Sequence, residues 1–152
     1  MTAHLIPTVV LIALTVAIHG VGAVAYLRML EAYRGFWERH AGFVFSILSL
    51  SWVVTTLVFL HLAEIGVWAG FYYLQGLFPD FETSVYYSLS SYTTVGFGDV
   101  VLQKEWRLLG ATEALVGILM TSWSVALLIG LLTELYRSDQ SRSGKKPPES
   151  QS

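Results

Sequence analysis

Thr93-Thr94-Val95-Gly96-Phe97-Gly98-Asp99 is the stretch that decides the fold of this 152-residue chain. In this heptad, Gly96 and Gly98 alternate with Val95 and Phe97. Glycine adopts left-handed backbone conformations at little cost, whereas other residues avoid them. The spacing therefore predicts a loop in which alternate residues supply unusual backbone while those between them pack outward. A tight turn is the simpler alternative for a G-x-G string alone, so the flanking sequence decides the interpretation.

The composition favours a membrane protein. Hydrophobic residues make up 54% of the chain and charged residues only 13%, and the mean hydropathy is +0.57. A soluble domain is about 25% charged, so this chain has too few charges to cover a surface in water. The absence of cysteine excludes disulfides and thiolate metal sites. A net charge of −2 gives a nucleic-acid partner no electrostatic support.

Three apolar stretches are long enough to cross a bilayer as helices, which takes roughly 20 residues for about 30 Å of hydrocarbon. Leu5 to Leu27 and Val44 to Ala63 contain no Asp, Glu, Lys or Arg. Leu108 to Leu132 contains one acid, Glu113. The intervening segment from Gln75 to Arg107 is too polar and too often broken by glycine to span the membrane.

The positions of Lys and Arg predict the orientation, because these residues concentrate on the cytoplasmic side. Most of them lie between the first two stretches or after the third, at Arg28, Arg34, Arg39, Arg137, Arg142, Lys145 and Lys146. We therefore expect a multi-pass protein of the cell (inner) membrane, with the N-terminus and the heptad outside and the C-terminus in the cytoplasm. The alternative, that the first stretch is a cleaved signal peptide, puts the heptad on the opposite side.

A short helix is predicted immediately before the heptad. The acids of Pro79-Asp80-Phe81-Glu82-Thr83-Ser84 are typical of a helix start. A helix from Phe81 to Ser91 has about three turns and is too short to span. The negative end of its dipole then faces the heptad, which favours a cation there. Because non-helical backbone at membrane depth persists only inside protein or along a water path, the heptad predicts several copies around an axis.

From Val44 to Arg137 this order of elements resembles the two-helix pore module of the potassium channel family, with the heptad as its selectivity filter. The chain looks most like small bacterial channels with an extra N-terminal helix. The resemblance implies an all-α membrane protein with three transmembrane helices, a re-entrant pore helix and a filter, assembled as a tetramer. It divides the chain into an N-terminal transmembrane helix (1–27), a cytoplasmic loop (28–43), the pore module (44–137) and a cytoplasmic tail (138–152).

The resemblance also implies the function, which is passive conduction of K⁺ by a protein that is not an enzyme and needs no cofactor. The implied partners are K⁺, the lipid bilayer and three further copies of the chain, with no nucleic acid. Backbone carbonyls of the filter replace the hydration shell of the ion. On this chain the ion-coordinating residues are Thr94, Val95, Gly96, Phe97 and Gly98, with K⁺ sites at the first four.

Residues expected to support the filter are Thr93, Asp99, Tyr86, Tyr87, Ser90 and Glu113. The chain departs from many relatives, which have Tyr at the position of Phe97 and Trp where Tyr86 and Tyr87 stand. The usual tyrosine brace of the filter is therefore absent, and we expect Tyr86 to donate to Asp99 instead.

The third stretch is expected to line an inner cavity, because several of its residues recur at helical spacing. Gly117 resembles the hinge glycine of the family, but close packing against the pore helix explains it equally well. Gly130 lies near where inner helices would cross. The predicted cavity and hinge residues are Gly117, Ile118, Thr121, Val125, Ile129 and Gly130.

The acids within the helices leave alternatives open. Glu113 is either a carboxyl that braces or gates the filter, or a hydrogen-bond partner of a pore-helix Ser or Tyr that only holds packing. Glu64 is expected at the membrane interface, paired with His61 three residues earlier. His19 is expected to be a helix-contact residue. The sequence shows no metal-binding spacing of His, Asp and Glu, and no nucleophile–base set.

Two other functions compete with a potassium channel. A weakly selective cation channel has the same architecture, although the intact T-V-G-F-G string argues against it. A non-conducting membrane scaffold requires the heptad to be accidental.

Overall fold

The computed structural model describes residues 5–32, 35 and 42–143, without the side chains of Phe43, Ser138, Asp139 and 141–143. All regular elements in these ranges are helical. In chain order they are α1 (Leu5–Ala32), α3 (Phe43–Leu74), α4 (Phe81–Tyr92), the short 3₁₀ helix η2 (Lys104–Trp106) and α5 (Arg107–Ser143).

Three of these helices, α1, α3 and α5, are long and apolar enough to cross a membrane, which confirms the three expected spans. All three run further than the apolar stretches, since α1 continues to Ala32, α3 to Leu74 and α5 to Ser143. Residues 138–143, the first part of the expected cytoplasmic tail, continue α5 as helix. No Gly or Pro interrupts the sequence from Leu131 to Ser143, so nothing there ends the helix. Residues 144–152, Arg34 and Arg39 lie outside the described part of the chain.

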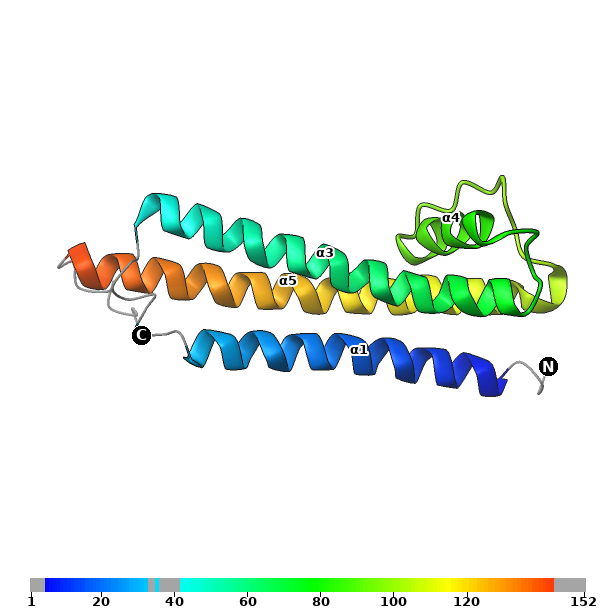
Figure 1. Ribbon diagram of the computed structural model, residues 1–152, viewed down its shortest axis with the longest axis horizontal. Coiled ribbons are helices and arrows are strands. Elements are labelled where there is room, and N and C mark those ends of the chain that lie inside the picture. The colour runs from blue at the N-terminus through cyan, green and yellow to red at the C-terminus, as the bar shows by residue number, and fades with distance from the viewer. Residues whose placement is uncertain (1–4, 33–34, 36–41, 144–152) are drawn as a thin grey trace, which may run out of the picture.

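The long helices lie side by side, and α4 sits at one end of them (Figure 1). The start of α1, the end of α3 and the start of α5 meet at that end, so successive long helices run in opposite directions. α4 packs against both α3 and α5. The short helix and the segment after it, residues 93–99 (the 93–99 loop), are therefore held by the two helices that flank them in sequence.

The largest buried cluster lies where α1 meets the end of α3 that carries α4. Trp68 and Tyr72 are completely buried there. Residues of α1 and α5 cover this face of α3. The cluster consists of Leu11, Trp68, Tyr72, Phe78, Leu102 and Leu109.

α1 is joined to α3 by polar contacts as well as by apolar packing. Trp68 Nε1 donates to Thr15 Oγ1 at 2.9 Å, and the Thr15 hydroxyl donates to Leu11 O at 2.9 Å. Further along, Gly22 allows close approach, since a Cβ there would lie 2.8 Å from Leu60 Cδ2. These contacts make α1 part of the core.

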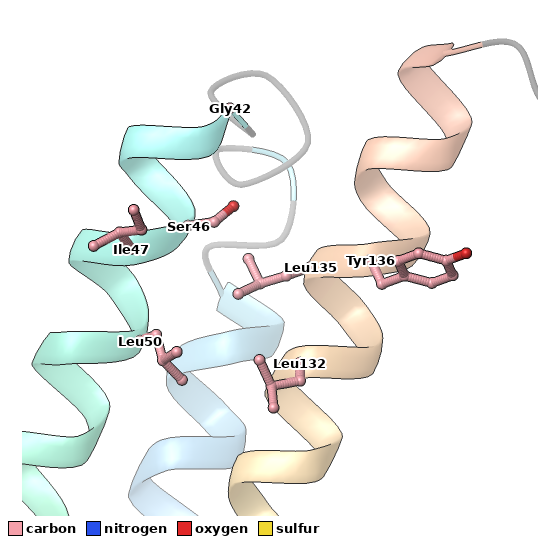
Figure 2. Close-up of a pocket in the computed structure, with 7 residues that line it drawn as sticks. All are labelled: Gly42, Ser46, Ile47, Leu50, Leu132, Leu135 and Tyr136. Carbon is pink, nitrogen blue, oxygen red and sulfur yellow. The ribbon is translucent and has the colours of Figure 1, made fainter.

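At the opposite end of the molecule, α3 and α5 diverge and leave an open groove (Figure 2). It is mostly apolar. Its lining residues are Gly42, Ser46, Ile47, Leu50, Leu132, Leu135 and Tyr136.

The bond between Trp68 and Thr15 gives the first prediction. Thr15→Val keeps the shape of the side chain but leaves the buried indole N–H without its acceptor, which costs about 1–3 kcal/mol. We expect the free energy of unfolding, measured by denaturant titration in mixed micelles, to fall by that amount. Thr15→Ser keeps the hydroxyl and is the matched control. Equal losses in both variants would show that the hydrogen bond contributes nothing.

Candidate functional site

α4 begins with a side-chain cap. Asp80 is extended, and its Oδ1 accepts a hydrogen bond from the backbone N–H of Thr83 at 2.7 Å. Because amide donors of the first turn stabilise the charged form, the pKa of Asp80 lies below its usual value. The helix start expected from the acids near Pro79 is therefore confirmed, and it fixes where the 12 residues of α4 begin.

Serines anchor the buried side of α4 to both neighbouring helices. Ser88 Oγ lies 3.0 Å from Ile65 O on α3 and 2.5 Å from Glu113 Oε1 on α5. One turn later, the hydroxyl of Ser91 donates to Gly110 O at 2.8 Å. These bonds satisfy polar groups that have no access to water, and they fix the direction in which α4 points.

Glu113 is completely buried and connects three helices. Its carboxylate accepts from Tyr72 Oη on α3 at 2.7 Å and from Ser88 on α4. These partners lie on α3 and α4 rather than in the 93–99 loop. The contact expected under the packing alternative, a hydrogen bond to a helix serine or tyrosine, is therefore present.

The C-terminal end of α4 touches the backbone of α5. A Cβ on Gly117 would lie 2.0 Å from Tyr92 O. Gly117 is ten residues past the start of α5, which is about 15 Å at 1.5 Å per residue. That distance is roughly half of a 30 Å hydrocarbon layer. The 93–99 loop therefore starts near the middle of the span.

The 93–99 loop alternates in backbone handedness. φ is positive at Thr94 (62°), Gly96 (56°) and Gly98 (79°) but not at Val95 or Phe97. Left-handed backbone was expected at the two glycines. It was not expected at Thr94, because a β-branched residue with positive φ is a rare outlier. Such strain persists only where the surroundings enforce it, and it concentrates at functional sites.

The amide groups of the loop face α4. Thr94 N donates to Ser91 O at 2.9 Å, Gly96 N to Ser90 O at 3.1 Å and Phe97 N to Ser90 Oγ at 3.3 Å. Among the described residues, no hydrogen bond reaches the carbonyl oxygens of 94–98. Backbone of alternating handedness turns successive N–H groups to one side. The carbonyls are left as a row of free acceptors, which suits a cation.

The two adjacent tyrosines of α4 have different surroundings. Tyr86 Oη donates to Asp99 Oδ2 at 2.7 Å, and its ring stacks on Phe97 at a centroid distance of 6.3 Å. The hydrogen bond from the tyrosine lowers the pKa of Asp99. Tyr87 instead packs against the buried rings of Tyr72 and Phe78. Tyr86 thus braces the loop, whereas Tyr87 anchors the helix.

The remaining sequence-predicted residues lie at the base of the loop or further along α5. Thr93 Oγ1 donates back to Leu89 O at 2.7 Å. Ile129 and Gly130 lie further along α5, where Gly130 has open space around its Cα. A hollow beside Thr94 contains three of the predicted cavity residues, and it is lined by Tyr92, Thr93, Thr94, Ile118, Thr121, Ser122 and Val125.

Comparison with known families agrees with this architecture. A family model described as an ion channel matches residues 47–134, more than half of the chain. The chain belongs to this ion channel family. The match begins in α3 and ends in α5, and it contains α4 and the 93–99 loop but not α1. None of the curated proteins and none of the solved structures compared with this channel chain matches it.

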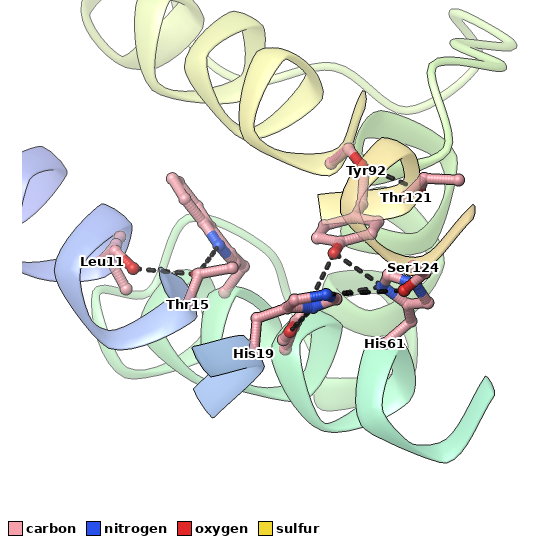
Figure 3. Close-up of polar contacts among 10 residues, drawn as sticks. Leu11, Thr15, His19, His61, Tyr92, Thr121 and Ser124 are labelled. Atoms are coloured by element: carbon pink, nitrogen blue, oxygen red, sulfur yellow. Dashed lines mark hydrogen bonds and ion pairs between the residues drawn. The ribbon is translucent and has the colours of Figure 1, made fainter. Parts of the chain in front are cut away.

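One polar cluster of this channel chain was missed in the sequence. His19, His61 and Glu64 lie together in the helix bundle (Figure 3). Glu64 was expected at the membrane interface but is completely buried, because α3 continues ten residues beyond it. The expectation that no His, Asp and Glu cluster exists is also wrong. His61 and Glu64 have the expected i, i+3 spacing. His19 comes from α1, 42 residues before His61, and no local pattern indicates that it joins them.

The brace between Tyr86 and Asp99 gives the second prediction. The pKa of Asp99 is depressed in the folded chain, so the brace is intact at neutral pH and is lost as the pH falls through that lowered pKa. Tyr86→Phe removes the donor and raises the Asp99 pKa toward its usual value. Carboxyl-carbon NMR on ¹³C-aspartate-labelled protein measures the change. Tyr73→Phe, which alters a tyrosine stacked on Phe81, is the control, and an unchanged Asp99 pKa in Tyr86→Phe would contradict the brace.

The contact at Gly117 gives the third prediction. Gly117→Ala forces the end of α4 away from α5, and overpacking of this kind costs about 1–3 kcal/mol. Gly130→Ala is the matched control on the same helix, where a Cβ meets nothing within 4 Å. Replacing Gly130 by alanine should stabilise α5 by roughly 0.5–1 kcal/mol. If unfolding titrations showed no loss of stability in either variant, the packing interpretation of Gly117 would be contradicted and the hinge interpretation would be favoured.

Proposed function

We propose that the chain is one subunit of a homotetrameric, potassium-selective channel whose filter is the 93–99 loop. The observation that carries the proposal is the backbone of this loop. It has left-handed residues at every second position and several amides bound to α4, and no carbonyl of 94–98 has a hydrogen-bond partner within the part of the chain that the structure describes. A row of carbonyl oxygens replaces water around K⁺ during conduction. In this proposal Thr94, Val95, Gly96, Phe97 and Gly98 coordinate the ion, and Thr94 adds its hydroxyl.

Exposure of the loop supports an assembly of several chains. Residues 93–99 are all exposed in the single chain, although they start near the middle of the span. Lipid offers no hydrogen bonds, so non-helical backbone at that depth has to face protein or water. Four copies around one axis satisfy this condition, because each loop then faces the others across a shared path for ions.

The hollow below the loop supports the inner part of the pathway. It lies between the 93–99 loop and α5, and Thr121 and Ser122 give it hydroxyl groups beside the apolar Ile118 and Val125. In the proposed tetramer this surface lines a cavity under the filter. The negative end of the α4 dipole, at Tyr92, points toward the same place and favours a cation there.

The distribution of positive residues supports the proposed orientation. Arg28 and Arg137 lie at the end of the bundle away from α4, whereas the loop lies at the other end. Because Lys and Arg favour the cytoplasmic side, the filter mouth faces outward and the groove of Figure 2 faces the cytoplasm.

Ion flux through Gly96→Ala gives the fourth prediction. Wild-type protein in proteoliposomes should pass K⁺ and exclude Na⁺, and Gly96→Ala should abolish the K⁺ flux. The matched control is Gly76→Ala, because Gly76 also has positive φ (64°) and free space around it but lies outside the loop. Both substitutions place alanine in left-handed backbone, at about 1–2 kcal/mol each. Only the first alters the proposed filter, so Gly76→Ala should keep its flux.

The same assay separates the competing functions. Equal Na⁺ and K⁺ flux would identify a weakly selective cation channel. Absence of flux from folded protein would identify a non-conducting scaffold. The mass of the detergent-solubilised complex should correspond to four chains, and a stable monomer would overturn the proposed assembly.

A further inference from the structure

The His–Glu cluster of His19, His61 and Glu64 lies where α1, α3 and α5 meet. Glu64 Oε1 lies 2.9 Å from His19 Nδ1, and Glu64 Oε2 lies 3.3 Å from His61 Nδ1. The ligand atoms of all three residues lie within 4.8 Å of one another. Two of these side chains are fully buried, and the third, His61, is 19% exposed. The Nδ1 atoms of both rings thus face the same carboxylate.

We propose that His19, His61 and Glu64 form a binding site for a transition-metal cation of the Zn²⁺ type. Two imidazole nitrogens and one carboxylate oxygen are a common ligand set of zinc sites that keep a fourth position open. Around a tetrahedral Zn²⁺ with bonds of about 2.0–2.1 Å, neighbouring ligand atoms are about 3.4 Å apart. The 2.9 Å separation joins His19 Nδ1 to Glu64 Oε1, and the 3.3 Å separation joins His61 Nδ1 to the other oxygen, Oε2, so each ring lies within about 0.5 Å of the ligand spacing to one oxygen of the carboxylate. Coordination requires the carboxylate to turn so that one oxygen faces both rings.

Ser124 on α5 fixes the outer side of both rings. Its hydroxyl oxygen lies 3.0 Å from His61 Nε2 and 3.5 Å from His19 Nε2 (Figure 3). A hydroxyl oxygen accepts two hydrogen bonds, so both rings can carry their proton on Nε2 and leave the Nδ1 lone pairs free for the metal. Metal-binding histidines usually have such an orienting partner on the second nitrogen. Ser124 is therefore a positioning residue for both ligands.

Tyr92 lies next to the open fourth coordination position of the proposed site. Its hydroxyl lies 2.9 Å from His61 Nδ1 and donates to Glu64 Oε2, so it stands beside the centre of the cluster. In the metal-free cluster a neutral ring that donates to Glu64 carries its proton on Nδ1, and when Zn²⁺ binds that proton is exchanged for one on Nε2, where Ser124 accepts it, so both ligands bind as neutral imidazoles with no net loss of protons from the rings. His61 is the partly exposed member and gives the ion its entry.

A metal in this place would connect α1 to the end of α4. His19 is on α1, and Tyr92 directly precedes the 93–99 loop. Bound Zn²⁺ would thus hold α1 against α3 next to the residue from which the loop begins. This consequence concerns the position of α1 and is independent of which ion the channel conducts.

Zinc binding by the purified full-length protein tests the proposal. We expect one Zn²⁺ per chain by metal analysis after desalting. X-ray absorption spectroscopy of the wild-type protein should show two imidazole ligands with N/O distances of about 2.0–2.1 Å. Amide hydrogen exchange around His19 should slow when Zn²⁺ is added. Absence of stoichiometric Zn²⁺, or a spectrum without two imidazoles, would overturn the site even if every variant failed to fold.

Substitutions then assign the ligands. His19→Ala and Glu64→Gln should each lose Zn²⁺ binding, whereas Ser124→Ala should weaken it by about 10–100-fold, as expected for an orienting partner. Glu82→Gln removes an exposed carboxyl at the start of α4, outside the cluster, and should leave binding unchanged. Unchanged binding in folded His19→Ala, or loss of binding in Glu82→Gln, would show that Zn²⁺ is held elsewhere. The ion-flux assay does not enter this test, so failure of the metal site and failure of the proposed channel are distinguishable.

Discussion

This structure depends on one constraint: backbone amides and carbonyls in the middle of a membrane need hydrogen-bond partners that lipid does not supply. A helix satisfies its own amides and carbonyls, but the 93–99 loop is not helical. Its amides at Thr94, Gly96 and Phe97 donate to Ser90 and Ser91 at the end of α4. Its carbonyls are left over, and lipid has nothing to offer them. α4 therefore accepts hydrogen bonds from amides of the loop, and the loop carbonyls are left for partners from outside the chain.

Holding α4 in place requires polar contacts in the apolar interior. Ser88, Tyr72 and Glu113 form a three-helix hydrogen-bonded group in which each polar atom has a partner. Close approach of backbones supplies the rest, because Gly117 lets Tyr92 O reach α5. Without a hydrophobic drive between helices in lipid, small residues and interhelical hydrogen bonds take over this role. α4 is thus fixed by the contacts that membranes make effective.

Much of this architecture is predictable from sequence, because the membrane demands long apolar helices and the heptad uses glycine. The three spans, the α4 start at Asp80 and the left-handed Gly96 and Gly98 follow from local patterns. The bond from Tyr86 to Asp99 was expected from the resemblance to the potassium channel family. The positive φ of Thr94 does not, because it is imposed by neighbours against the preference of a β-branched residue. Tyr87 and Trp68 turn inward because helices distant in sequence cover them. Side-chain direction across helix interfaces is a property of the packed bundle.

The buried cluster at His19 changes how α1 relates to the rest of the channel. The family match covers residues 47–134 and omits α1, which would suggest an accessory helix. Yet Glu64, inside the matched region, is completely buried and has His19 of α1 as a hydrogen-bond partner at 2.9 Å. Removing α1 would take away that partner and expose Trp68, whose indole donates to Thr15. A carboxylate in the membrane interior is costly unless it is paired. His61 and Tyr92 pair with Oε2 of Glu64, and His19 of α1 pairs with Oε1, so α1 completes the pairing of this buried carboxylate and is part of the fold unit.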